Sequence, residues 1–174
     1  PCYSDHNHAW QQALEIDGDF MRKMAELAAE HRCYVAFNVT MRRSSHREHK
    51  DASVQSEITV TSCMLSPSGE LIQQSDKQLL TDYEKTFFVV GNKTAKPINT
   101  PDTKLGLVSG NDSINFEASR ELALAESQLL CNGISSFSND HSNLHSIARA
   151  SENDVYFVSA NKIGPLFLDS PSNE

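Results

Sequence analysis

The segment of residues 103–115, with the sequence TKLGLVSGNDSIN, constrains the fold more than any other part of the chain. Its apolar residues 105–108 predict a buried strand, and the small and polar residues 109–112 end that strand abruptly. A helix is expected to begin near Phe116. α/β enzymes display a nucleophilic side chain at such a sharp strand-to-helix turn. Here the residue at the tip of the turn is Gly110, which has no side chain.

Length and composition predict one globular domain. The chain has 174 residues, of which 39% are hydrophobic, enough to build a core. The formal net charge of −8 disfavours nucleic acid and anionic membranes as partners, because phosphates are bound by basic surfaces. No apolar run approaches the roughly 18 residues of a membrane span. The chain begins at Pro1 without a methionine, which leaves N-terminal targeting open, and we expect a location in the cytoplasm or an organelle matrix.

Strand and helix patterns alternate along the rest of the chain and predict an α/β fold with mixed strand pairing. A helix is predicted to begin at residues 17–19. Its residues at helical spacing form one face, which consists of Phe20, Met24, Leu27, Ala28 and His31. The near-continuous apolar run at 33–39 is typical of a strand buried on both faces. Further strands are expected over 57–66, 70–74, 127–132 and 155–161, and further helices over 116–126 and 141–153.

The four cysteines, Cys2, Cys33, Cys63 and Cys131, have no CxxC spacing. In a chain of this length they indicate reduced, partly buried thiols rather than a disulfide framework. Cys33 and Cys63 fall inside strand patterns and are predicted to lie in the core. Cys131 ends a strand and could approach a site at the strand ends, although a thiol nucleophile requires a structurally fixed turn.

Two pairs of polar residues could carry chemistry. Lys77 and Glu84 lie seven residues apart after a predicted strand. A buried lysine beside a carboxylate can stabilise an oxyanion and orient a nucleophile, whereas an exposed pair is simply solvated. His141 and His145 have the spacing of metal ligands on a helix, but no third ligand or HExxH motif accompanies them, which favours a partly exposed histidine pair. With no Gly-rich phosphate loop either, we expect no metal and no cofactor.

Over residues 9–166 the chain resembles the nitrilase superfamily of carbon–nitrogen hydrolases. Five segments carry the resemblance in the family's order: 17–40 (DGDFMRKMAELAAEHRCYVAFNVT), 66–84 (SPSGELIQQSDKQLLTDYE), 104–124 (KLGLVSGNDSINFEASRELAL), the amidase-like 135–153 (SSFSNDHSNLHSIARASEN) and 148–166 (ARASENDVYFVSANKIGPL). The resemblance implies an α-β-β-α sandwich with mixed sheets. It also implies that residues 1–174 form a single partial domain lacking the first and last strands of the fold.

The family's chemistry uses a cysteine, two glutamates and a lysine. The cysteine attacks an amide or nitrile carbon, one glutamate is the general base, and the lysine stabilises the oxyanion with the support of the other glutamate. The resemblance places Lys77 as the lysine, Glu84 as the supporting glutamate and Gly110 at the position of the cysteine, with the general base before residue 1. The expected substrate-pocket residues are Asn111, Asp112, Cys131 and Asn132.

Two functional hypotheses follow from Gly110. In the first, the domain is a pseudoenzyme, because loss of a nucleophile costs on the order of 10⁶ in rate. It would then serve as a structural or binding subunit, in a homo-oligomer or a larger assembly, with an interface at 113–126 and 141–153. In the second, it is an active amidase-type hydrolase of non-peptide C–N bonds, and unseen chain or a partner supplies the missing residues. A small amide-like ligand is a possible occupant of the pocket in either case.

Overall fold

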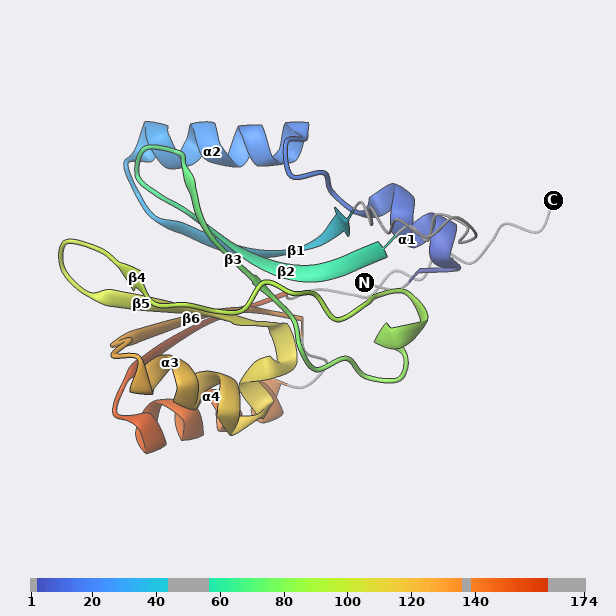
Figure 1. The fold of residues 1–174 in the computed structure, drawn as a ribbon. Helices are drawn as coiled ribbons and strands as arrows, with labels where there is room; N and C mark the ends of the chain where they lie inside the picture. Colours follow the sequence, from blue (N-terminus) through green and yellow to red (C-terminus); the bar gives the residue numbers. More distant parts are fainter. Residues whose placement is uncertain (1–2, 44–56, 136–138, 163–174) are drawn as a thin grey trace.

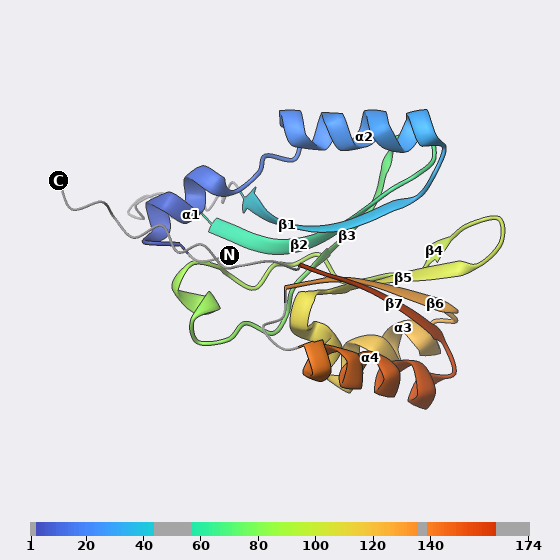
Figure 2. The ribbon, with the colours of Figure 1, turned by 180° about the vertical axis from the view of Figure 1, so that it is seen from behind.

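Two β-sheets stacked face to face form the centre of the molecule (Figure 1). The structure is a computed structural model that describes residues 3–43, 57–135 and 139–162. Helix α2 lies on the outer side of the first sheet, and helices α3 and α4 lie together on the outer side of the second, as the view from behind also shows (Figure 2). The described chain therefore has the α-β-β-α layers that the family resemblance implies.

The first sheet is built from the N-terminal half of the chain. Its strands are β1 (Val35–Arg43), β2 (Glu57–Leu65) and β3 (Leu71–Asp76), in the order β1-β2-β3, and both pairings are antiparallel. The helices before it are α1 (His6–Gln12) and α2 (Asp19–His31), and the 3₁₀ helix η1 (Glu84–Thr86) follows it. Mixed pairing was expected in both sheets, but this sheet is wholly antiparallel, because the short turn after β2 folds β3 back as a hairpin.

The second sheet is mixed, as predicted. Its strands are β4 (Ile98–Asn99), β5 (Lys104–Ser109), β6 (Leu129–Ile134) and β7 (Tyr156–Asn161), in chain order across the sheet. β4 is antiparallel to β5, whereas β5, β6 and β7 are parallel and joined through α3 (Phe116–Leu124) and α4 (Asn139–Asn153). The 3₁₀ helix η2 (Gly110–Ile114) lies between β5 and α3. The carboxyl ends of the parallel strands thus meet at one edge, where ligands bind in open α/β sheets.

Apolar side chains fill the space between the two sheets. Met64 of the first sheet is buried in one cluster with Leu105 and Leu107 of the second. Near the turn between β5 and η2, which we call the elbow, the sheets come into close contact, since an ideal Cβ at Gly133 would lie 2.9 Å from the Cβ of Asn38. Any larger residue than glycine would therefore force β1 and β6 apart at this point.

Two sequence predictions about burial are wrong in detail. The buried residues of α2 are Met21 and Ala28, whereas Phe20, assigned to the apolar face, is 43% exposed. The run at 33–39 begins its strand only at Val35, and Cys33 lies exposed before it. Of the residues of β1 only Met41 is buried, so the prediction of a strand buried on both faces is wrong. The prediction that Cys63 is buried in the core is confirmed.

No helix among the described residues is both long enough and apolar enough to cross a membrane.

Candidate functional site

The elbow after β5 holds Gly110 in a left-handed backbone conformation, with a φ of +54°. An ideal Cβ built on Gly110 would lie 3.5 Å from Cε and 3.6 Å from Cδ of Lys77, which is ordinary van der Waals contact. A side chain at this position would not displace its neighbours and would point at the lysine, but the left-handed backbone would strain it. The strained strand-to-helix turn on which α/β enzymes present a nucleophile is therefore present in geometry.

Lys77 reaches the elbow from the other sheet. It follows β3 directly, and its backbone N–H donates to the Val60 carbonyl oxygen at 2.8 Å. Its side chain is only 2% exposed, and its ammonium group forms an ion pair with Oε1 of Glu84. The other carboxylate oxygen of Glu84 accepts a hydrogen bond from the Thr81 N–H at 2.8 Å.

The Glu84 carboxylate is held in its charged form. Burial alone raises the pKa of Glu84, but the hydrogen bonds from Lys77 and Thr81 and the lysine charge outweigh burial and hold the pKa below its usual value. Neither side chain is exposed, so the solvated alternative for these two residues is wrong.

Asp112 connects the elbow to the loop that follows Lys77, which we call the lysine loop. Its two carboxylate oxygens accept hydrogen bonds from the backbone N–H groups of Gln78 at 2.8 Å and Leu79 at 2.9 Å. Burial raises the pKa of Asp112, and these two backbone donors offset part of that rise. The side chain next to the elbow thus fixes the backbone just after Lys77.

A cavity of about 650 Å³ opens beside these residues. Lys77, Glu84, Gly110 and Asn111 contribute its polar side. Its apolar lining comes from Ala36, Phe37, Val39, Val60, Phe88 and Ile134. The cavity therefore lies where the carboxyl ends of β5 and β6 face the first sheet, with the lysine–glutamate pair in its wall.

The sequence profile of the carbon–nitrogen hydrolases matches residues 1–171. The chain belongs to the carbon–nitrogen hydrolase family. The resemblance to the nitrilase superfamily, stated from five segments of the sequence, is thereby confirmed. A comparison with curated protein sequences finds no significant match.

Solved structures of the amidase from Nesterenkonia sp. AN1 share the fold. One, with acrylamide added at the active-site cysteine, has a TM-score of 0.66 at 21% identity and covers 83% of this chain and 54% of its own. A cysteine-to-serine mutant has a TM-score of 0.70 at 20% identity and covers 94% and 61%. A cysteine-to-alanine mutant in complex with butyramide has a TM-score of 0.66 at 21% identity and covers 83% and 53%. This carbon–nitrogen hydrolase chain thus spans about half the length of these amidases.

The family resemblance assigned seven residues to the site, and the structure brings four of them together. Lys77, Glu84, Gly110 and Asn111 all line the cavity. The other three are not among its lining residues. Asp112 binds the lysine loop, and the Asn132 amide donates to the Ser113 hydroxyl at 3.0 Å. Cys131 packs against the apolar cluster between the sheets, and burial raises the pKa of its thiol.

Sequence reasoning missed the residues around Glu84 in the loop after Lys77 and the contribution of β1. Thr81, Tyr83 and Phe88 line the cavity from that loop. The apolar run at 87–90 within a polar stretch was the available signal. The Asn38 amide of β1 donates to the hydroxyls of Ser62 at 3.0 Å and of Ser109 at 3.1 Å, beneath the elbow. No sequence signal pointed to Asn38, because its partners come from two other strands.

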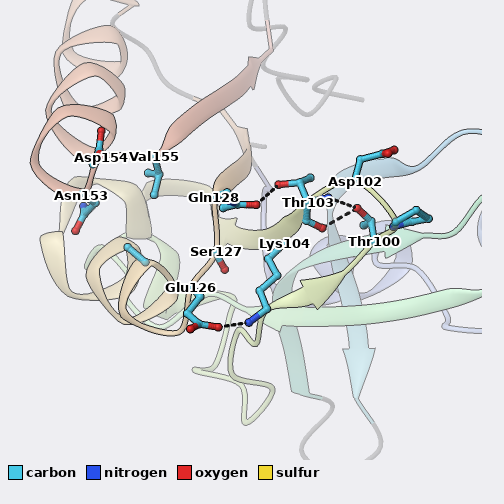
Figure 3. A pocket seen from close by; sticks show the side chains of 12 residues that line it. Thr100, Asp102, Thr103, Lys104, Glu126, Ser127, Gln128, Asn153, Asp154 and Val155 are labelled. Atoms are coloured by element: carbon cyan, nitrogen blue, oxygen red, sulfur yellow. Dashed lines mark hydrogen bonds and ion pairs between the residues drawn. The ribbon is translucent and has the colours of Figure 1, made fainter.

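The opposite end of the second sheet carries another pocket, of about 640 Å³ (Figure 3). It is lined by the residues around the starts of β5, β6 and β7 and around the ends of α3 and α4. An ion pair of Lys104 with Glu126 and a hydrogen bond of 3.1 Å from Thr103 to Gln128 cross it. None of the residues singled out from the sequence lies there.

The pair of His141 and His145 is only partly described. The side chain of His141 lies outside the described part of the chain, as does Cys2. Within the described residues, no three histidine, cysteine, aspartate or glutamate side chains come together as a metal site.

Proposed function

We propose that this carbon–nitrogen hydrolase domain does not hydrolyse amides and serves as a binding or structural subunit of an assembly. The observation that carries the proposal is the glycine at the tip of the elbow. A side chain at position 110 would face Lys77 and its partner Glu84, but Gly110 has none. The family's chemistry begins with a thiolate attacking the substrate carbon, and glycine offers no atom for that attack. The lysine can stabilise an oxyanion only after a nucleophile has formed one.

No thiol among the described residues of the cavity lining stands in for the missing nucleophile. Ser109 precedes the elbow, but it is 1% exposed and its hydroxyl accepts a hydrogen bond from Asn38. Glu84, the one carboxylate among the described lining residues, is bonded through both oxygens to Lys77 and Thr81. A free general base is therefore lacking there as well.

The outer face of α3 and α4 supports the assembly half of the proposal. Phe116 is 57% exposed, Leu144 64% and Ile147 68%. Several large apolar side chains exposed on two helices that contact each other favour a surface that is covered by a partner. Light scattering coupled to size exclusion should therefore give a mass above that of one chain, and Ile147→Glu should lower it.

The catalytic half is tested by ammonia release and by covalent trapping. The wild-type chain should release no ammonia from butyramide. Acrylamide should add to a cysteine introduced by Gly110→Cys, mapped by peptide mass spectrometry, while the cavity of the wild type stays unmodified. Ammonia release by the wild type that disappears in Lys77→Met would overturn the proposal.

The second candidate is an active amidase-type hydrolase completed by chain outside this sequence or by a partner. The retained, charged Lys77–Glu84 pair beside an open cavity favours it. It predicts ammonia release from butyramide when a longer form or a partner is present, with a cysteine brought close to Lys77. Absence of turnover in every such mixture counts against it.

A further inference from the structure

The second sheet extends one strand further than the first on one side of the molecule. β1 lies against β6, and β2 lies against β5. Since the order of the second sheet is β4-β5-β6-β7, its last strand, β7, lies beyond the outer edge of β1. Within the described chain, no strand of the first sheet therefore covers the inner face of β7.

This inner face of β7 is apolar and exposed. Tyr156 is in register with Leu129, and its second neighbour Val158 is in register with Cys131. Both of these partners on β6 pack against the cluster between the sheets. Residues in register on neighbouring strands point to the same face, so Tyr156 and Val158 also point inward. They are nevertheless 78% and 57% exposed, so positions of core type are left uncovered along β7.

The outer edge of β1 is paired at one end only. The Leu14 N–H donates to the Thr40 carbonyl oxygen and the Arg42 N–H to the Leu14 carbonyl oxygen, both at 2.8 Å. Every second residue of an antiparallel strand directs its backbone groups away from the partner strand. Because the pairing of β1 with β2 is regular, Ala36 and Asn38 direct theirs to the same edge as Thr40. Among the described residues, these groups have no backbone partner.

The cavity at the elbow reaches the same edge. Its lining includes every residue from 36 to 40 of β1 and, from β7, Ala160. Successive residues of a strand point to opposite faces, so a cavity that touches such a run borders the edge of the strand. Residues 35–39 carry no charge, proline or bulge, the features with which proteins protect a free edge. We call the space between this edge and Tyr156 and Val158 of β7 the edge gap.

The edge gap is one strand wide, which excludes a second copy of this chain joined through its own β1. Neighbouring strands in a sheet lie about 4.8 Å apart. Two copies paired through β1 would bring their β6 strands equally close together, and the two β7 strands would then need the same space. A single extended segment meets no such clash.

We infer that the edge gap binds an extended peptide segment of a partner protein, which pairs with the backbone of Ala36 and Asn38 and places alternate apolar side chains on Tyr156 and Val158. Strand addition of this kind obtains affinity from backbone hydrogen bonds and selectivity from every second side chain. The inference rests on the assembly half of the proposed function and names a second surface, with the kind of partner that it takes.

A capped heptapeptide of alternating threonine and valine is the probe. Amide hydrogen exchange of the whole isotope-labelled chain, followed by NMR, reports on single residues. With the peptide at about ten times its Kd, exchange at Ala36 and Asn38 should slow about tenfold. Exchange at Phe37, whose N–H is directed to β2, should not change. No binding, or protection that omits Ala36 and Asn38, would overturn the inference.

A second peptide tests the backbone pairing. It keeps the valines and carries proline in place of the inner threonines, which removes their N–H donors. It should bind at least about tenfold more weakly, the loss expected for one or two hydrogen bonds. Equal affinities for the two peptides would contradict strand addition.

Variants at exposed positions test the place of binding without threatening the fold. Val158→Lys puts a charge where an apolar side chain of the peptide should lie, and should weaken binding about tenfold. Leu144→Lys, on the 64% exposed Leu144 of α4, is the matched control and should leave the affinity unchanged. Equal losses in the two variants would place the peptide elsewhere and would overturn the inference.

Exchange without any peptide tests the other occupants. The amides of Ala36 and Asn38 should exchange rapidly in the chain alone. Their protection without peptide, in this chain or in a longer form of it, would show that the protein fills the gap itself and would overturn the inference.

The two proposals fail separately. Ammonia release from butyramide by the wild type refutes the non-hydrolysing function, whatever the peptide does. Absence of hydrolysis together with no peptide binding refutes only the edge gap as a binding surface.

Discussion

Removing the charge of Glu84 tests the energetic weight of the buried pair. Glu84→Gln keeps the shape of the side chain and leaves the Lys77 ammonium, at 2% exposure, without a counter-charge. Breaking a fully buried ion pair from one side costs about 3–5 kcal/mol, and an exposed pair contributes about 0–1 kcal/mol. The Glu84 side chain is 21% exposed, so we expect an intermediate loss of about 2 kcal/mol.

Urea unfolding followed by circular dichroism measures this loss. With a slope of about 2 kcal/mol per molar urea for a chain of this size, the midpoint should fall by about 1 M. Asp82→Asn is the matched control, since it removes a carboxylate from the exposed pair with Lys85 in the same loop and should leave the midpoint unchanged. Equal shifts in the two variants would refute the reasoning.

The pH dependence gives a second readout of the same variant. The pKa of Glu84 is lower in the folded chain than its usual value of about 4.3. Its stabilising contribution is therefore complete above about pH 4.3 and is lost as the pH falls through the folded-state pKa. The difference in stability between wild type and Glu84→Gln should shrink over that acidic window. A difference that persists well below it would mean that charge is not its cause.

Two further predictions concern residues around the site. Gly91→Ala should destabilise the fold by about 2 kcal/mol in urea unfolding. The added Cβ would lie 2.1 Å from the buried carboxylate of Asp76, which an ion pair with Arg43 holds in place. The control, Asn92→Ala at an exposed position, should not change the unfolding midpoint. In a Cys2→Ser background, N-ethylmaleimide mapped by mass spectrometry should label exposed Cys33 well before Cys131 and Cys63, since burial raises the pKa of Cys131 and brings that of Cys63 to about 12. Faster labelling of Cys63 would contradict its burial.

The elbow and the order of the elements could be predicted because their signals are local. The apolar run at 105–108 and the change to small, polar residues at 109–112 lie next to each other in the sequence. The structure confirms both the strand and the turn, in β5 and η2. The same holds for the hairpin of β2 and β3, whose turn residues are adjacent.

Burial and pocket lining could not be predicted in this way, because they depend on partners distant in sequence. The apolar run at 33–39 does not show where the strand begins, and Cys33 lies before β1 and is exposed. Asp112 and Asn111 are adjacent, yet Asn111 lines the cavity while the Asp112 carboxylate binds the Gln78 and Leu79 backbone. Which of two neighbours faces a ligand is decided by the opposite sheet.

The candidate site is divided between the two sheets. Lys77 stands at the end of β3 in the first, and Gly110 at the end of β5 in the second. Two hydrogen bonds connect the two sheets at the site. The Gln78 N–H donates to the Asp112 carboxylate, and the Asn38 amide donates to the Ser109 hydroxyl. Neither half of the chain can form the cavity alone, so the site comes into being only at the step of folding in which the sheets dock. A reporter group at position 110 would time that step, and binding would be lost whenever the sheets part, even with every strand intact.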